Sequence, residues 1–326
     1  MAGMKNVPVL VPAHFHAGTR ENIGTIFDRR DFVKLDLSEL SAGQRSEIRA
    51  IASFANVSAD MMDALPNLEI ISSFGVGYDS VDAKHAAAKG IMVTNTPDVL
   101  TEEVADTALG LLLMTVRELG QAEQYVRKGL WAKNGPYRMT PTTLRGRTVG
   151  IMGLGRIGLS IARRLEGFGV KIAYHNRSQR NDVSYDYYPT LVALAEAVDT
   201  LIVIAPGGSS TDKAVNATVL KALGKDGVLI NIGRGSTVDE AALIEALQAG
   251  TIHSAGLDVF ENEPNVPQAL IDLPNTVLLP HVGSASMHTR KAMGDLVLDN
   301  LQRWFSGTDV ATPVDECVKA DVRRHG

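Results

Sequence analysis

The sequence predicts an α/β fold built on parallel β-sheets, and three observations lead to it. Short runs of β-branched and other apolar residues alternate with helical stretches along almost the whole chain, which is the α/β arrangement. Several expected strands are continuously apolar, a pattern typical of strands buried on both faces of a parallel sheet. The chain of 326 residues is too long for one ordinary core and suits two domains.

The individual elements follow from local signals. The expected strands are short apolar runs bounded by turns or helices: Val7–Val11, Leu68–Ser72, Ile91–Thr94, Thr148–Met152, Lys171–Tyr174, Thr200–Ile204, Gly227–Asn231, Ser254–Leu257 and Thr276–Leu279. The expected helices include stretches with helical spacing of apolar residues: Val81–Lys89, Thr101–Tyr125, Ile157–Phe168, Tyr188–Ala197, Asp239–Gln248 and Ala285–Phe305.

The long helix after Thr101 suggests a domain boundary. Thr101 precedes two acidic residues, so it is expected to be the N-cap of that helix. We expect residues 1–99 and 289–326 to form one domain, with residues 100–288 inserted as a second, contiguous domain. The stretch 128–147 is rich in Gly, Pro and Arg and is expected to be an extended arm.

Composition excludes several classes of partner and location. A net charge of −5 and 5% aromatic residues disfavour nucleic acid and anionic membrane surfaces. The apolar stretch Ala108–Val116 is far shorter than the ~20 residues that cross a bilayer, and Val7–Val11 is too short for a signal peptide. The single cysteine, Cys317, cannot form an internal disulfide. We therefore expect a cytoplasmic protein. His14 and His16 lack further metal ligands nearby, so we expect no metal site.

A glycine-rich segment follows the strand Thr148–Met152 and matches the pattern G-x-G-x-x-G. Gly153 permits a tight turn, Gly155 lets the backbone approach a pyrophosphate, and Gly158 lets the next helix pack closely. The helix N-terminus adds free N–H groups and a positive dipole end. A glycine-rich turn without a ligand is the alternative, but the flanking strand and helix favour a Rossmann dinucleotide-binding domain. The expected ligands in this segment are Gly153, Leu154, Gly155, Arg156, Ile157 and Gly158.

The end of the second strand of that domain indicates which dinucleotide binds. NAD sites usually place an acidic residue there to accept the ribose hydroxyls. This chain has Asn176 instead, followed by Arg177, Ser178 and Arg180. A neutral donor and two cations suit a dianionic 2′-phosphate. The sequence therefore predicts NADP(H) as the preferred cofactor and NAD(H) as a second one, unless both arginines are ordinary surface charges.

Three polar residues follow later strands. Arg234 comes after 227–231, Glu263 lies beyond 254–257, and His281 follows 276–279. Ligands of open α/β sheets bind beyond the carboxyl ends of the strands, so these side chains can converge at one site. Each also has an ordinary interpretation, as a helix-capping charge, a turn residue before a proline, or a loop histidine.

Six segments of the chain form a recognisable series. They are, in order, Phe74–Asp79, Thr101–Asp106, Gly153–Gly158, Asn231–Gly235, Gly256–Phe260 and Pro280–His281. Together they resemble the D-2-hydroxyacid dehydrogenase family, and especially its glyoxylate/hydroxypyruvate reductase branch. The similarity covers almost the whole chain. It implies a Rossmann cofactor domain inserted into a smaller, flavodoxin-like substrate-binding domain.

The resemblance implies roles for the polar residues. His281 is the general acid that protonates the substrate carbonyl, since imidazole groups titrate near neutral pH. Glu263 bonds the other ring nitrogen and favours the charged imidazolium. Arg234 binds the substrate carboxylate with its guanidinium fork and polarises the ketone, while the amides of Val76 and Gly77 hold the remaining carboxylate oxygen.

Further cofactor contacts are implied in the same way. Asp258 resembles the residue that bonds the nicotinamide carboxamide. The other expected contacts are Thr101, Ala205, Pro206, Thr211, Ile232, Gly233, Arg234, His281, Gly283 and Ser284.

Substrate and assembly are the least specific predictions. Ser53, Phe54 and Trp131 are candidates for the wall of the substrate pocket. Trp131 resembles a tryptophan that reaches the partner subunit's site, or it anchors the arm at an interface. We expect a homodimer built on the Thr101 helix and the arm.

Glyoxylate and hydroxypyruvate are the first expected substrates, and a bulkier aryl-pyruvate is a second candidate. The same motifs would also suit a 3-phosphoglycerate dehydrogenase, a formate or phosphite dehydrogenase, or a dinucleotide-sensing protein without turnover.

Overall fold

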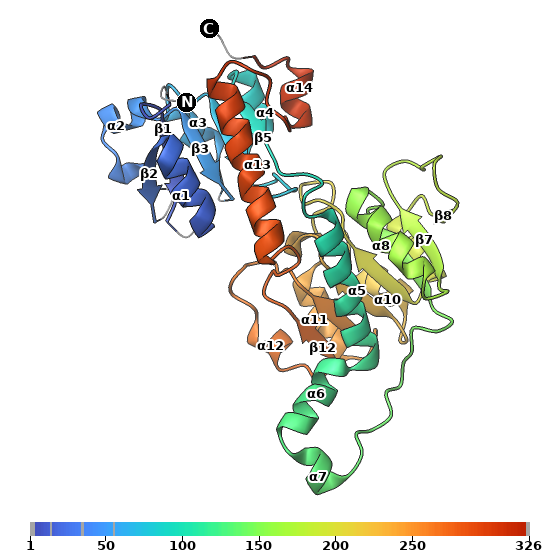
Figure 1. Ribbon diagram of the computed structural model, residues 1–326. Helices are drawn as coiled ribbons and strands as arrows, with labels where there is room; N and C mark the ends of the chain where they lie inside the picture. The colour runs from blue at the N-terminus through green and yellow to red at the C-terminus, as the bar shows by residue number, and fades with distance from the viewer. Residues whose placement is uncertain (1–3, 14, 34–35, 55, 324–326) are drawn as a thin grey trace. The chain divides into compact units, whose positions relative to one another are not determined.

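The computed structural model describes residues 4–13, 15–33, 36–54 and 56–323, so His14 of the His-x-His pair lies outside the described residues. The chain forms two compact units, Met1–Leu100 with Ser286–Gly326, and Thr101–Ala285 (Figure 1). The boundaries expected from the sequence, after residues 99 and 288, lie close to these limits.

The first unit is built on a five-stranded parallel sheet in the order β2-β1-β3-β4-β5. This is the flavodoxin-like strand order, so the predicted architecture of the unit is confirmed. Pairing of β1 with both β2 and β3 places the buried Val9 and Leu10 on an interior strand of the sheet. The strands are β1 Pro8–Pro12, β2 Asp28–Phe32, β3 Ala50–Ser53, β4 Ile70–Ser73 and β5 Met92–Thr94.

Helices cover both faces of this sheet. The long helix α13 packs against α1 and β4, and α14 packs against α4. The α1–α13 contact is close, because a Cβ added to Gly294 would lie 1.9 Å from Thr19 Oγ1. The helices are α1 Ala17–Ile26, α2 Ala42–Glu47, α3 Ala59–Asp63, α4 Ala83–Ala88, α13 Met287–Phe305 and α14 Asp315–Lys319, with a 3₁₀ turn η1 at Leu37–Glu39.

The second unit contains a seven-stranded parallel sheet in the order β12-β11-β10-β9-β6-β7-β8. Its first six strands in sequence have the 3-2-1-4-5-6 order of the Rossmann fold, which confirms the predicted cofactor-domain architecture. The strand order reverses between β6 and β9, beside the predicted glycine turn. The strands are β6 Thr148–Met152, β7 Lys171–His175, β8 Asp186–Tyr187, β9 Thr200–Val203, β10 Val228–Asn231, β11 Ser254–Leu257 and β12 Thr276–Leu278.

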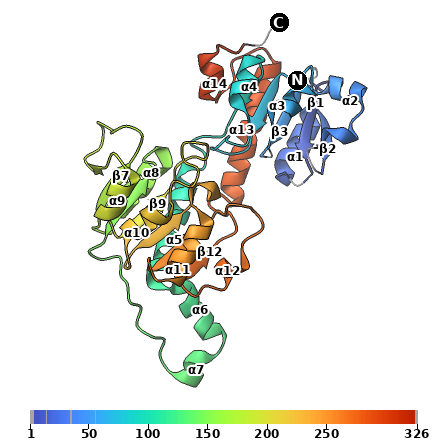
Figure 2. The same cartoon turned by 180° about the vertical axis from the view of Figure 1, so that it is seen from behind.

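The helices of the second unit lie on two faces of its sheet. Figures 1 and 2 show α5 and α8 on one face and α9, α10 and α11 on the other. A core that includes Leu194, Leu220, Leu229 and Leu243 lies between the sheet and the second group. The helices are α5 Thr101–Arg117, α6 Leu119–Arg127, α7 Leu130–Asn134, α8 Arg156–Glu166, α9 Leu191–Ala197, α10 Ala217–Leu223, α11 Glu240–Gln248 and α12 Gln268–Ile271, with a 3₁₀ turn η2 at Gly235–Thr237.

The prediction of one continuous helix over Thr101–Tyr125 is wrong, because the structure has two helices there, α5 and α6. Glu118 has φ 51°, which separates α5 from α6. Its carboxylate accepts a hydrogen bond of 3.0 Å from Tyr137 Oη and pairs with Arg138, so two residues from the arm stabilise the break. Thr101 is itself the first residue of α5 and not its N-cap.

The arm is only partly extended, because it contains the short helix α7 before the chain returns to β6 (Figure 1). No helix among the described residues is both long enough and apolar enough to span a bilayer.

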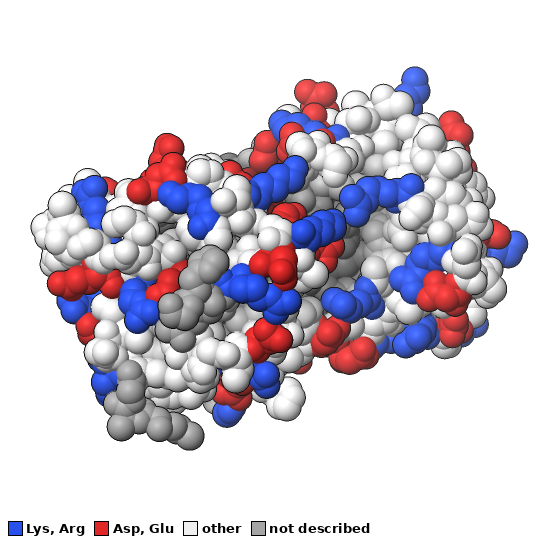
Figure 3. All heavy atoms as spheres, turned by 90° about the horizontal axis from the view of Figure 1, so that it is seen from above, with Lys and Arg blue, Asp and Glu red and all other residues white. Residues whose placement is uncertain are grey.

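The edge strand β2 was not predicted, because four of its five residues are charged. Charged residues are common on edge strands, where they oppose pairing with other chains. Here Arg29 Nε lies 3.1 Å from Asp31 Oδ1, and Arg20 also pairs with Asp31. Acidic and basic side chains are likewise intermixed over the face of the molecule that Figure 3 shows.

Candidate active site

The glycine turn lies between β6 and α8, at the point where the strand order reverses. Gly153 has φ +103°, a conformation that favours glycine. A Cβ added there would lie 2.8 Å from the backbone nitrogen of Ala205, at the end of β9. The turn can therefore close against the neighbouring strand only with glycine at this position.

The other two glycines of the turn have different surroundings. A Cβ on Gly158 would lie 2.3 Å from the carbonyl oxygen of Gly153, whereas a Cβ on Gly155 would meet nothing within 4 Å. Gly155 is also the N-cap of α8 and brings no side chain to bond the first-turn N–H groups. The turn thus presents open backbone at a helix N-terminus, which fits the pyrophosphate of a dinucleotide.

The segment after β7 contacts the same turn. Leu154 N–H donates to Asn176 Oδ1 at 2.7 Å, and Arg180 Nη1 donates to the Leu154 carbonyl at 3.0 Å. Since a donor faces Oδ1, the amide hydrogens of Asn176 are directed elsewhere. Arg177 and Ser178 are exposed. This edge offers donors and cations where NAD-binding domains usually offer a carboxylate.

Arg234 follows β10 and is held through its own backbone. Asn231 Nδ2 donates to the Arg234 carbonyl at 2.9 Å, and Asn231 Oδ1 accepts from Gly233 N–H at 3.1 Å. The guanidinium Nη1 donates to the Gly233 carbonyl at 2.9 Å. The buried amide of Asn231 therefore shapes the turn from which Arg234 extends.

His281 and Glu263 form the contact that gives this site its chemistry. His281 Nδ1 lies 2.7 Å from Glu263 Oε2, and Glu263 Oε1 accepts from Phe260 N–H at 3.0 Å. Burial by itself would raise the pKa of Glu263. Hydrogen bonds from His281 and Phe260, with the charges of His281 and Arg234, outweigh it and hold that pKa below its ordinary value.

The pair leaves one imidazole nitrogen available. A carboxylate only accepts hydrogen bonds, so the ring nitrogen that faces Glu263 carries a proton. The other nitrogen, Nε2, belongs to a side chain that is 49% exposed. His281 is thus oriented by one nitrogen and can donate or accept a proton with the other.

Asp258 anchors the loop that carries His281. Its carboxylate accepts from Val282 N–H at 2.7 Å and from Gly283 N–H at 2.8 Å, and its carbonyl accepts from His281 N–H at 2.9 Å. Asp258 is 1% exposed. Burial raises its pKa, although both amide hydrogen bonds oppose this rise. The predicted contact between Asp258 and the nicotinamide carboxamide stays a prediction.

This arrangement of turn and side chains matches a known family. The sequence model described as D-isomer specific 2-hydroxyacid dehydrogenase, NAD binding domain, matches residues 109–283. The chain belongs to the D-isomer-specific 2-hydroxyacid dehydrogenases. The resemblance inferred from the six segments is therefore confirmed.

Individual members of this dehydrogenase family are similar over most of their length. A glyoxylate/hydroxypyruvate reductase A of Arabidopsis thaliana is 52% identical over 85% of this chain and 88% of the relative. A hydroxyphenylpyruvate reductase of Plectranthus scutellarioides is 49% identical over 88% and 89%. The structure of an NADPH-dependent glyoxylate/hydroxypyruvate reductase of Sinorhizobium meliloti, in complex with NADP and malonate, is 58% identical with a TM-score of 0.95, covering 98% of this chain and 99% of that one.

In this dehydrogenase, the remaining predicted cofactor residues of the second unit follow the carboxyl ends of strands. The exception is Thr101, at the start of α5. Thr211 Oγ1 donates to the Pro206 carbonyl at 2.7 Å, which closes the loop after β9. The contacts of all these residues with a dinucleotide stay predictions. These strand-end residues are Ala205 and Pro206 after β9, Ile232 and Gly233 after β10, and Gly283 and Ser284 after β12.

Val76 and Gly77 belong to the first unit, and their role as substrate ligands stays a prediction. Asn95 Nδ2 donates to the Val76 carbonyl at 2.8 Å. Tyr78 Oη donates to Glu316 Oε2 at 3.1 Å, and burial together with that carboxylate raises the pKa of Tyr78 to about 12. The turn that contains Val76 and Gly77 is thus held by Asn95 on one side and by the Tyr78–Glu316 contact on the other.

The other predicted wall residues differ in exposure. Ser53 ends β3 and is 2% exposed, whereas Phe54 is half-exposed and stacks on Phe15 with 5.7 Å between ring centroids. Trp131 lies on α7 and is 61% exposed. Their contacts with substrate also stay predictions.

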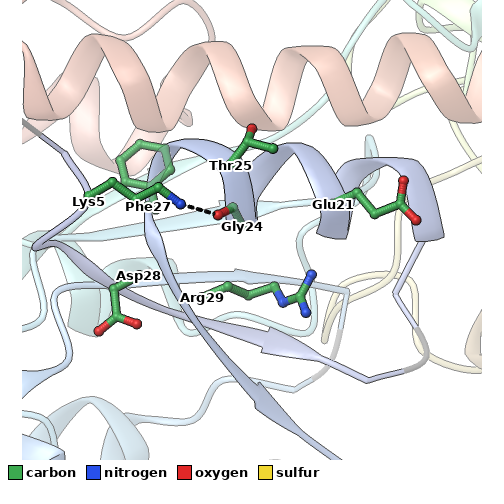
Figure 4. Close-up of a pocket in the computed structure, with 7 residues that line it drawn as sticks. All are labelled: Lys5, Glu21, Gly24, Thr25, Phe27, Asp28 and Arg29. Atoms are coloured by element: carbon green, nitrogen blue, oxygen red, sulfur yellow. Dashed lines mark hydrogen bonds between the residues drawn. The ribbon is translucent and has the colours of Figure 1, made fainter. Parts of the chain in front are cut away.

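A separate pocket lies between α1 and β2 (Figure 4). Its two cationic side chains are bonded within the protein. Lys5 Nζ donates to the Gly24 carbonyl at 2.6 Å, and Arg29 Nη1 donates to the Arg20 carbonyl at 2.9 Å. None of the predicted site residues lines it, so this pocket does not alter the assignment of the site.

Three residues that contact predicted site residues were not expected from the sequence. Asn95 directly follows β5, and a polar residue at a strand end is the signal that could have found it. Asp182 pairs with Arg180, and Tyr174 bonds the backbone of Arg180. Tyr174 gave no such signal, because a tyrosine in an apolar run is expected to serve as core.

The contrast between Gly155 and Gly158 yields a prediction. Gly155→Ala should change the free energy of unfolding by less than about 0.5 kcal/mol, yet weaken dinucleotide binding, because the methyl group enters space open to the pyrophosphate. Gly158→Ala should lower both binding and the free energy of unfolding, the latter by about 1–3 kcal/mol, since its Cβ meets a backbone oxygen. Urea unfolding and titration with NADPH measure the two effects. Unimpaired binding by Gly155→Ala would contradict the assignment of the turn.

Proposed function

We propose that this chain is an NADPH-dependent reductase that converts small 2-keto acids, first glyoxylate and hydroxypyruvate, into D-2-hydroxy acids. The observation that carries the proposal is the 2.7 Å contact between His281 Nδ1 and Glu263 Oε2, in a unit that also contains a dinucleotide turn. When bound, the reduced nicotinamide supplies the hydride that reaches the keto carbon.

His281 acts as general acid in this reaction. Its Nε2 gives a proton to the carbonyl oxygen, which becomes the hydroxyl of the product. Glu263 keeps Nδ1 protonated and stabilises the imidazolium before transfer. In the oxidation direction, the neutral ring accepts the proton from the hydroxyl.

Arg234 binds the carboxylate of the keto acid. Its guanidinium presents paired donors that match a planar carboxylate, and its charge polarises the neighbouring ketone. Amides of Val76 and Gly77 provide the second carboxylate contact in this proposal. Ser53 is a candidate for the wall beside the substrate's side chain.

The preference for NADPH is attributed to Asn176, Arg177, Ser178 and Arg180. The similarity to a reductase described as NADPH-dependent supports it. So does the geometry, because Oδ1 of Asn176 is engaged by Leu154 N–H and its amide hydrogens remain as donors. NAD(H) serves as the second cofactor.

An aryl-pyruvate is a second candidate substrate, favoured by 49% identity to a hydroxyphenylpyruvate reductase. Turnover of glyoxylate, hydroxypyruvate and hydroxyphenylpyruvate, each with NADPH and NADH, distinguishes the two. A kcat/KM that is highest for the aryl substrate would contradict the first choice. Binding of NADPH without turnover of any of the three would favour a sensing protein.

We also propose a homodimer formed through α6, α7 and the rest of the arm, in a cytoplasmic enzyme. Neither helix contains a buried residue. Helix α6 exposes Leu119 and Val126, and the arm exposes Trp131 and Met139, the last 91% exposed. Exposed apolar residues mark interaction surfaces where they form a patch. In such a dimer, Trp131 is positioned to reach the partner's substrate.

His281→Ala should lower kcat for glyoxylate reduction by about 10²- to 10⁴-fold, the usual contribution of a general acid. Its dissociation constant for NADPH should stay near that of the wild type, because the glycine turn is unaltered. His253→Ala, at the amino end of β11, is the matched control and should retain normal kcat. Stopped-flow turnover and fluorescence titration provide both values, and near-normal kcat in His281→Ala would remove it from the mechanism.

Asn176→Asp should reduce the ratio of NADPH to NADH kcat/KM by at least about tenfold, because a carboxylate repels the 2′-phosphate. Gln179→Glu adds the same charge at an exposed position of the segment and controls for net charge. Steady-state kinetics with both cofactors measure the ratio. An equal shift in the two variants would mean that Asn176 has no specific role.

Trp131→Glu should shift the proposed dimer towards monomer, because a carboxylate at a buried interface loses its hydration. Sedimentation velocity measures the shift. Met287→Glu, at a residue 90% exposed and outside the arm, should leave the association state unchanged. A Trp131→Glu variant that associates like the wild type would place the interface elsewhere.

A further inference from the structure

The hydroxyl of Tyr174 closes the segment that follows β7. Tyr174 is fully buried. Its Oη accepts from Arg180 N–H at 2.8 Å and donates to the Arg180 carbonyl at 3.4 Å. One side chain thereby satisfies both backbone groups of a residue six positions later, which ties the end of the segment 176–180 to the strand where it begins.

A second tyrosine holds the beginning of the same segment. Tyr187 on β8 donates from Oη to the Asn176 carbonyl at 3.3 Å. Its ring packs on Tyr174 with centroids 5.4 Å apart. The segment therefore has hydroxyl contacts at both of its ends.

Two side chains of the segment 176–180 also bond the glycine turn at Leu154. Asn176 Oδ1 accepts from Leu154 N–H, and Arg180 Nη1 donates to the Leu154 carbonyl. Arg180 is also fixed by Asp182, with Nε donating to Oδ1 at 2.9 Å. Asn176, Arg177 and Ser178 thus extend from a backbone whose two ends are bonded.

We propose that Tyr174 is a positioning residue for cofactor preference: its hydroxyl holds the segment 176–180 in the conformation that receives the 2′-phosphate. The inference rests on the NADPH preference proposed above. Tyr174 is buried behind the segment and acts through it, without touching the cofactor itself.

The hydroxyl should matter for NADPH far more than for NADH. The pyrophosphate of either cofactor binds at the glycine turn, which keeps its own backbone packing at Gly153 and Gly158. The 2′-phosphate, in contrast, depends on the segment itself. Loss of the two bonds to the Arg180 backbone frees that end of the segment, so Arg177 and Ser178 can move away and the selective contact weakens.

Tyr174→Phe tests this, because it removes the hydroxyl and keeps the buried ring. The full chain is titrated calorimetrically with adenosine 2′,5′-bisphosphate and with adenosine 5′-monophosphate, which differ in the 2′-phosphate. We expect binding of the bisphosphate to weaken about tenfold and that of the monophosphate to change less than about twofold. The NADPH to NADH ratio of kcat/KM should fall in parallel, with kcat at saturating NADPH unchanged.

Two further variants complete the experiment. Tyr185→Phe removes a hydroxyl that bonds Glu166 at 2.6 Å, outside the segment, and should bind both ligands like the wild type. Tyr187→Phe breaks the bond to Asn176 alone and should shift selectivity in the same direction by a smaller factor. It provides the test if Tyr174→Phe proves unstable in thermal unfolding.

The outcomes separate this inference from the proposed function. A wild-type protein that binds both nucleotides equally overturns the NADPH assignment and the inference with it. A wild type that selects the bisphosphate, with variants at Tyr174 and Tyr187 that select it equally well, overturns the inference alone. Equal weakening of both ligands would assign Tyr174 a general structural role and would also overturn it.

Discussion

Close backbone packing at the carboxyl end of β9 is the constraint on which the site depends. Glycines that follow the two neighbouring strands, β6 and β10, pack against the residue Ala205. A Cβ atom added to Gly153 would lie 2.8 Å from its backbone N, and one added to Gly233 would lie 2.8 Å from its backbone O. This packing brings the turn after β6 and the turn after β10 to the same edge of the sheet. The cofactor turn and Arg234 are thereby neighbours, although 79 residues separate Gly155 from Arg234 along the chain.

The two carboxylates at this edge of the second sheet, Asp258 and Glu263, have different surroundings and different roles. Asp258 is buried and serves the backbone, since it fixes the loop on which His281 stands. Glu263 faces the imidazole and has a lowered pKa. A carboxylate whose folded pKa is depressed contributes stability above its unfolded pKa, about 4.3, and loses it as the pH falls through the folded value. The Glu263 carboxylate therefore stays charged across the neutral range.

The segment that follows β7 is supported from behind by hydrogen bonds. Asn176, Arg177 and Ser178 supply the groups suited to a phosphate, while Tyr174, Tyr187 and Asp182 bond the backbone and side chains of the same segment. Such support makes the position of weak surface donors reproducible, and a phosphate gains from each donor only if its position is held.

The sequence by itself determined most of the buried parallel strands, with Thr148–Met152 and Ser254–Leu257 matching their observed limits, although the expected strands did not include the buried β3. It also determined the glycine turn, because continuous apolar runs and Gly spacing are local signals. It also indicated Arg234, Glu263 and His281 as polar residues that follow strands, and their catalytic roles stay predictions. Only the tertiary structure decided the break at Glu118, the charged edge strand Asp28–Phe32 and the hydrogen bonds of the Tyr174 hydroxyl. Each depends on partners distant in sequence or on the edge position of a strand, and no local pattern encodes which groups will meet.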